Sequence, residues 1–174
     1  MARVCGPDSD VQIIKKSVRV VILRTSIILI SNAFGYEYQA LVVKVIDGDT
    51  IVVNHNNDRR KIRLIYIDAP EIDQVYGKDS KIFLKNILSN QIITVNTIKK
   101  DKYSRELSEI YLYFDSNPIF VNAKMIKSGN AWVYKHNRKN EYLINLENFA
   151  RTHKSGLWSE NTAIEPWIFR KTKK

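Results

Sequence analysis

The segment that decides the fold is QALVVKVIDGDTIVVNHNNDRRKIRLIYI, residues 39–67. Residues 39–46 are dense in β-branched side chains and predict a strand. The turn residues Asp47-Gly48-Asp49 separate it from a second predicted strand over residues 50–53. After a polar loop at 55–58, residues 61–67 predict a third strand. Three strands at such short spacing indicate a meander.

Beyond residue 67 the sequence changes period and then returns to strands. Apolar residues recur at i,i+4 within residues 78–88 and predict a helix. Residues 91–98 and 107–114 predict two more strands, and residues 120–128 and 141–153 predict two more helices. Five strands with a helix between the third and the fourth is the order of an OB-type barrel. The expected fold class is α+β (mainly β), an OB-fold five-stranded barrel with three helices.

The first 33 residues differ from the domain that follows, residues 34–174. Basic residues precede an apolar stretch at 27–30, and Ser31-Asn32-Ala33 come next, which is the layout of a secretory signal peptide. We therefore expect cleavage after Ala33 and a secreted or periplasmic protein. Arg24 interrupts the apolar zone, which leaves two alternatives open: an uncleaved N-terminal membrane anchor, or an intracellular basic tail.

The charge balance favours a polyanionic partner. The chain has 28 Lys and Arg against 18 Asp and Glu, a net charge of +10. Residues 34–174 keep 23 against 16, or +7, so the basic excess belongs to the domain as well. Nucleic acid and an anionic membrane surface both fit such a charge. The single cysteine, Cys5, lies outside the domain, which therefore folds without a disulfide, and no Cys/His cluster indicates zinc.

Charged residues gather at the ends of the predicted strands, in DGDT (47–50), at Arg63, in DAPE (68–71) and in DKYSR (101–105). Taken singly, each is explained by a salt bridge or a solvated turn. Together they supply what phosphodiester hydrolysis needs: oxygen ligands for a divalent cation, a carboxylate that orients or deprotonates water, and guanidinium groups for phosphate oxygens. Other phosphoryl chemistry uses the same groups, so spacing alone leaves the substrate open.

Six segments resemble successive motifs of the thermonuclease (staphylococcal nuclease) family, in the family's order, across about residues 40–160. They are VIDGDTIVV, IRLIYIDAPE, YGKDSKIFLKNIL, DKYSRELSEIYL, IKSGNAWVY and SGLWSE. The resemblance implies an OB-type barrel with helices. It also implies a calcium-dependent nuclease that hydrolyses DNA and RNA, favours single-stranded or locally unpaired substrate, and acts as a monomer.

The resemblance assigns roles to individual residues. Asp49 and Asp68 match the family's calcium-binding aspartates, and Ala69 stands where a main-chain carbonyl joins the metal. Glu71 matches the glutamate that positions or activates the attacking water.

Two arginines, Arg63 and Arg105, match the phosphate-binding arginines of the family. The residues that match the lining of the nucleotide pocket are Lys102, Tyr103, Trp132 and Tyr134. Trp132 stands where a tyrosine is often found, and its ring could stack on a base.

The chain departs from the family on both sides of Arg105. Ser104 replaces a common glycine and is strained if the site requires a positive φ. Glu106 is expected to pair with Arg105 and compete with phosphate. His136 is expected on the surface, and Trp167 and the basic C-terminal end of the chain are expected to be peripheral.

Two alternatives to an enzyme remain open. One is a catalytically weak OB-fold module that only binds nucleic acid, although the acids and arginines are all present. The other is a surface protein whose basic domain binds acidic polymers.

Overall fold

The computed structural model describes residues 36–173. The predictions for residues 1–33, a signal peptide and cleavage after Ala33, lie outside the described residues. Within the described part of the chain, none of the helices has the length and apolar character that crossing a membrane requires.

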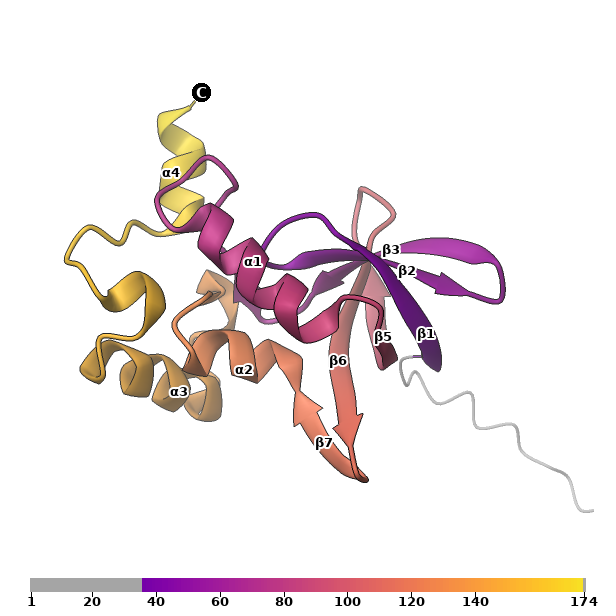
Figure 1. Cartoon of the computed structure of the whole chain (residues 1–174). Helices are drawn as coiled ribbons and strands as arrows, with labels where there is room; N and C mark the ends of the chain where they lie inside the picture. The colour runs from indigo at the N-terminus through magenta and orange to yellow at the C-terminus, as the bar shows by residue number, and fades with distance from the viewer. Residues whose placement is uncertain (1–35, 174) are drawn as a thin grey trace, which may run out of the picture. The chain divides into compact units, whose positions relative to one another are not determined.

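Five strands form a closed barrel (Figure 1): β1 (Tyr36–Val45), β2 (Thr50–His55), β3 (Asp58–Leu64), β5 (Ile92–Lys100) and β6 (Glu106–Phe114). They pair in the order β3-β2-β1-β5-β6, and a parallel pairing of β3 with β6 closes the barrel. A further strand, β7 (Asn117–Phe120), pairs with β6 beyond the barrel. This architecture confirms the predicted OB-type barrel.

Left-handed backbone at three residues shapes the meander. Asn56 and Asn57, with φ of 51° and 64°, make the tight turn between β2 and β3, and asparagine adopts this conformation at little cost. Tyr66 has φ 73° and ends the third strand, which was predicted to run unbroken from 61 to 67. That prediction was wrong. The chain resumes as β4 (Ile67–Asp68), which pairs with β8 (Trp132–Val133) outside the barrel sheet.

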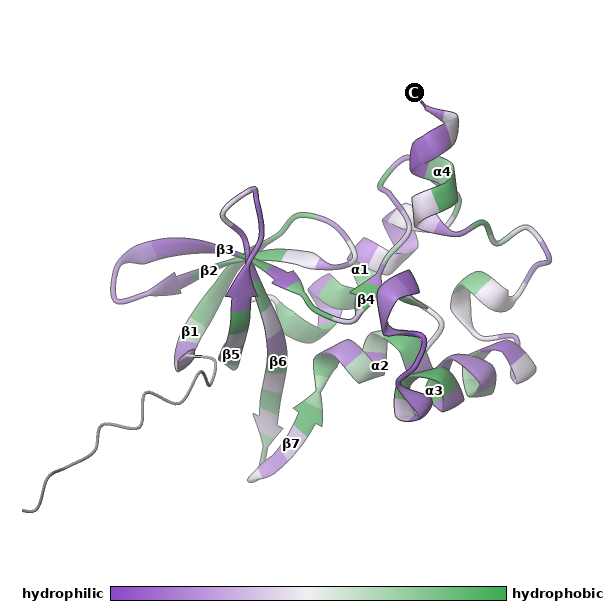
Figure 2. Ribbon diagram, turned by 180° about the vertical axis from the view of Figure 1, so that it is seen from behind, coloured by the Kyte–Doolittle hydropathy of each residue, from purple (hydrophilic) through white to green (hydrophobic). Residues whose placement is uncertain are grey.

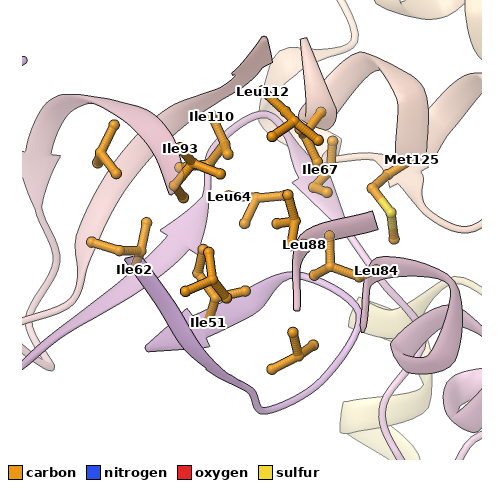
Figure 3. Close-up of a cluster of buried hydrophobic side chains, with 14 of the residues drawn as sticks. Ile51, Ile62, Leu64, Ile67, Leu84, Leu88, Ile93, Ile110, Leu112 and Met125 are labelled. Carbon is orange, nitrogen blue, oxygen red and sulfur yellow. The ribbon is translucent and has the colours of Figure 1, made fainter. Parts of the chain in front are cut away.

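Apolar side chains from the barrel strands and from helix α1 (Gly77–Leu88) meet inside the barrel. Figure 3 shows them converging, and those with 0% exposure include Ile51, Ile62, Leu64, Leu84, Leu88 and Ile110. Each large aliphatic side chain buried in this way contributes about 1.5–3 kcal/mol. The core thereby fixes the strand ends that carry the charged residues.

The structure has four α-helices within its described residues, where three were predicted. They are α1, α2 (Val121–Lys127), α3 (Glu141–Thr152) and α4 (Pro166–Thr172), with short 3-10 turns at Lys135–Asn137 and Gly156–Trp158. The additional helix is α4, which begins at a proline in its first turn, a position where the fixed φ of proline favours a helix. In Figures 1 and 2 the helices lie to one side of the barrel and the β2–β3 hairpin projects from the other.

Candidate active site

Asp49 lies in the turn between β1 and β2 and is 3% exposed. Its carboxylate accepts hydrogen bonds from the main-chain N–H of Ala69 at 2.9 Å and from the hydroxyl of Thr50 at 3.0 Å. Asp47 accepts the N–H of Asp49 at 3.0 Å and so stabilises the turn, as predicted. Gly48 is needed between them because a Cβ there would overlap Ala69 and helix α1. These contacts fix Asp49 beside Ala69.

Arg63 projects from β3 between two buried carboxylates. Its Nη1 lies 2.5 Å from Oδ1 of Asp49, and its Nη2 lies 2.7 Å from Oδ1 of Asp68. Burial alone would lower the pKa of Arg63, but the two aspartates raise it above its ordinary value, so Arg63 stays charged. For Asp49, burial raises the pKa, and the positive charge of Arg63 acts against that shift. The arginine inside an apolar strand is therefore matched by anions, as its position in the sequence requires.

Glu71 stands on a short loop just after Asp68 and Ala69. Its main-chain N–H donates to Oε1 of Gln74 at 3.1 Å, and its carbonyl accepts the N–H of Gln74 at 2.8 Å. The chain returns so closely that a Cβ at Gly77 would overlap the carbonyl oxygen of Glu71. The side chain itself is 39% exposed. The loop is thus held in place while the carboxylate stays accessible.

Helix α4 adds an arginine that sequence reasoning missed. Arg170 places its Nη2 2.6 Å from Oδ2 of Asp68 and its Nη1 2.6 Å from Oε1 of Glu71. Burial alone would lower the pKa of Arg170, but the hydrogen bonds with these two carboxylates raise it above its ordinary value. Trp167 of the same helix packs edge-on against Trp132, with ring centroids 6.1 Å apart. The prediction that Trp167 and the basic C-terminal end are peripheral was wrong.

Arg105 lies at the end of the loop between β5 and β6. Asp101 accepts its main-chain N–H at 3.0 Å and its Nε at 2.8 Å, and also accepts the N–H of Tyr103 at 2.9 Å. Burial acts to raise the pKa of Asp101, but these hydrogen bonds outweigh it and lower the pKa. Ser104 has φ 61°, so the site does require a positive φ at a non-glycine residue.

Glu106 does not pair with Arg105, contrary to the prediction. Its Oε2 accepts the hydroxyl of Tyr38 at 2.5 Å and that of Thr97 at 3.0 Å, and only 6% of the residue is exposed. Because successive residues of a strand point to opposite faces, Glu106 faces away from Arg105. Arg105 is held instead by Asp101.

A cleft of about 830 Å³ brings most of the predicted residues together. The predicted residues among its lining are Arg63, Glu71, Lys102, Tyr103, Arg105 and Tyr134. A volume of this size is typical of ligand sites in proteins. The lining also includes Tyr66, His136 and Arg170, none of which was predicted as a site residue.

Those three additions were hard to find from the sequence. Tyr66 lies within the alternating pattern that predicts the third strand, and no neighbouring residue signals the left-handed backbone that turns the chain there. His136 is exposed, as predicted, and its ring lies 5.1 Å from that of Tyr134, two residues before it. Pro166 signals a helix start, but the sequence does not indicate that this helix reaches Asp68.

Trp132 is not among the residues that line this cleft. It is 4% exposed, and its ring packs against Trp158 at 4.2 Å between centroids, against Trp167, and beneath the guanidinium of Arg151. Its faces are therefore covered by protein, which does not fit the predicted stacking on a base.

The donor set beside the cleft fits a hard divalent cation. Asp49 and Asp68 supply carboxylates, and Ala69 is fixed against Asp49 through its N–H. Guanidinium groups already lie at 2.5–2.7 Å from these carboxylates, so the position favours positive charge. Residues 36–173 contain no group of three or more His, Cys, Asp and Glu side chains placed to hold a metal. A cation there would rely on two carboxylates, a carbonyl and solvent or substrate oxygens.

Comparison with known proteins gives a consistent result. The family model described as Staphylococcal nuclease homologue matches residues 61–160. The chain is 40% identical over 132 residues to a protein of Escherichia coli O157:H7 named "Uncharacterized endonuclease", covering 76% of this chain and 84% of the relative. It is 31% identical over 155 residues to the "Micrococcal nuclease" of Shigella flexneri, covering 85% and 89%. A third relative, "Protein ParB" of Escherichia coli, is 32% identical over 153 residues, covering 84% and 86%.

The positions of Trp132 and Tyr103 lead to opposite expectations. Trp132→Ala should lower the free energy of unfolding by about 3–5 kcal/mol because it empties part of the aromatic cluster. Tyr103 is 67% exposed, so Tyr103→Ala should leave stability unchanged and weaken binding of a single-stranded oligonucleotide by about 1–3 kcal/mol. Urea unfolding and fluorescence-anisotropy titrations measure the two effects. A stable Trp132→Ala protein with strongly reduced oligonucleotide affinity would contradict this assignment.

Proposed function

The chain belongs to the staphylococcal nuclease family and is a nuclease, and from this premise we propose that it is a calcium-dependent phosphodiesterase acting on both DNA and RNA. The observation that carries the proposal is that Arg63, Glu71 and Arg105 line one cleft, and that Arg63 contacts the buried carboxylates of Asp49 and Asp68 directly behind it. These are the groups required for attack of water on a phosphodiester.

Nucleases of this family are metal-dependent, and calcium is the metal we propose here. Asp49, Asp68 and the carbonyl of Ala69 would hold it. They come from separate turns and offer only three protein oxygens, which makes an irregular shell completed by water and phosphate oxygens. Calcium accepts six to eight oxygens at variable angles, whereas magnesium requires near-octahedral placement. When bound, the cation would neutralise charge on the phosphate and polarise it towards attack.

The protein's own residues would carry the proton and the phosphate. Glu71, accessible at the cleft, would take a proton from the attacking water. Arg63 and Arg105 would bind the phosphate oxygens with paired N–H donors and stabilise the charge that develops on them. Both arginines now contact aspartates, Arg63 with Asp49 and Asp68 and Arg105 with Asp101. We therefore propose that phosphate competes with these aspartates for the guanidinium groups.

The far part of the cleft would hold the nucleotide. Tyr103 is exposed and lies beside Lys102, whose Nζ is 5.0 Å from the centre of its ring, and Tyr134 lines the same cleft. Aromatic rings bind unpaired bases by stacking, which a paired duplex does not permit. This arrangement supports a preference for single-stranded or locally unpaired substrate.

Glu71→Gln tests the proposed general base. The substitution keeps the size of the side chain but removes its capacity to accept a proton, so cleavage of plasmid should slow by roughly 10²–10⁴-fold. Oligonucleotide binding and the thermal midpoint should stay close to those of the parent. Retention of activity within a factor of about three would remove Glu71 from that role.

The choice of metal is tested by titrating calcium and magnesium against plasmid cleavage. Calcium should support cleavage, magnesium should support much less, and excess chelator should abolish it. Asp49→Asn and Asp68→Asn should each weaken calcium binding and lower the rate, since each removes one of two anionic ligands. Full activity in magnesium alone, or in excess chelator, would refute a calcium site at these residues, whereas absence of cleavage with either metal would favour the nucleic-acid-binding module.

We also propose that the protein is exported. Expressed in a bacterial host with residues 1–33 intact, the mature protein should begin at Phe34 after cleavage behind Ala33. Mass spectrometry of the soluble protein measures this directly. A mature chain that retains Met1 or Ala2 in the cytoplasm would contradict export.

A further inference from the structure

Arg170 binds the oxygens that a metal ion at this site would use. Its guanidinium contacts both oxygens of Asp68, at 2.6 Å from Nη2 and 3.2 Å from Nη1, and Nη1 also lies 2.6 Å from Oε1 of Glu71. Arg63 occupies Oδ1 of Asp68 at 2.7 Å. Asp68 has 0% exposure, so these two arginines supply the positive charge that its burial requires.

Packing of helix α4 fixes the position of Arg170. Pro166 is buried at the start of the helix and Trp167 packs on the aromatic cluster around Trp132. Just before the helix, the carbonyl of Ile164 accepts the side-chain N–H of Gln74 at 2.6 Å. At its end, Lys173 forms a salt bridge with Asp73. Both ends of the helix are therefore tied to the loop that carries Glu71.

A metal ion bound at Asp68 would compete with the present contacts of Arg170. Guanidinium hydrogens already take three of the roughly four lone-pair sites of the Asp68 carboxylate, and a cation there would also face the adjacent positive charge of Arg170. Of the two arginines, Arg63 is the more enclosed, since its side chain is 19% exposed. Arg170 is the one with a route out, since its side chain is 41% exposed.

We propose that Arg170 is an internal counter-cation that the metal ion displaces from Asp68, and that this displacement also releases the contact of Arg170 with Glu71. The inference rests on the proposed calcium site and adds its regulation. In the Arg170-bound arrangement, Oε1 of Glu71 accepts an N–H from the same guanidinium group that binds Asp68. Displacement of Arg170 from Asp68 frees Glu71 as well, because one guanidinium group binds both carboxylates. Metal affinity therefore includes the free energy of breaking these contacts.

Calorimetric titration of calcium into the full-length protein tests the competition. Arg170→Gln should bind calcium at least about five-fold more tightly than the parent, the lower end of the usual range for coupled sites. The matched control is Lys171→Gln, which removes a positive charge from the next position of the same helix and should shift the affinity much less. Equal or weaker calcium binding by Arg170→Gln than by the parent would overturn the proposal.

Arg170→Lys separates the specific contacts from net charge and serves if Arg170→Gln folds poorly. A lysine keeps the charge but cannot hold two carboxylates with a planar fork. Arg170→Lys should therefore bind calcium more tightly than the parent and less tightly than Arg170→Gln. Unchanged affinity in Arg170→Lys would show that the contacts do not compete with the metal. If neither the parent nor the Arg170 variants bind calcium, the proposed calcium site fails and this inference fails with it, whereas equal binding by all overturns only the inference.

Discussion

The site depends on one constraint: the carboxylate of Asp68 has no exposed surface and must be matched by positive charge within hydrogen-bonding distance. Arg63 from β3 provides it at Oδ1, and Arg170 from α4 provides it at both oxygens. Arg63 and Arg170 lie far apart in the chain, so the barrel, the β4 segment that carries Asp68 and the C-terminal helix must all be in place together. The pairing therefore couples the site to the whole domain.

The chain reaches this arrangement through a break in a strand. Had β3 continued through residue 67, Asp68 would have stayed in register with the barrel sheet. The left-handed Tyr66 ends the strand, and β4 pairs with β8 instead, opposite Trp132. The same step places Trp132 beside Trp158 and Trp167, which is the surface on which α4 packs. One backbone position thus both buries Asp68 and supports the helix that neutralises it.

The strands, three of the helices and the cluster of acids and arginines follow from local patterns, because alternation, i,i+4 spacing and turn residues act over a few positions. Ser104 was identified as strained if its φ is positive because the family commonly has glycine there, and its φ of 61° agrees. Arg170 and Trp132 could not be placed in this way. Their surroundings consist of residues distant in sequence, and a basic C-terminal segment has the same composition whether it is solvated or docked. Glu106 was predicted to pair with Arg105 because the two residues are adjacent in sequence, but successive residues of a strand point to opposite faces.

The charges around the cleft divide it into two regions. On one side, Asp49, Asp68 and Glu71 form salt bridges with Arg63 and Arg170, and Asp47 lines the cleft beside them, so four acids against two arginines leave this side with two more negative than positive charges. Lys99, Lys102 and Arg105 line the same cleft from the β5–β6 side, with Asp101 as the acid that holds Arg105. A phosphodiester is therefore attracted first to the basic side, and it gains little from the acidic side until a divalent ion reverses the sign there. Under the function proposed, metal binding does more than supply a ligand for phosphate: it completes a continuous positive surface across which the scissile group can be held.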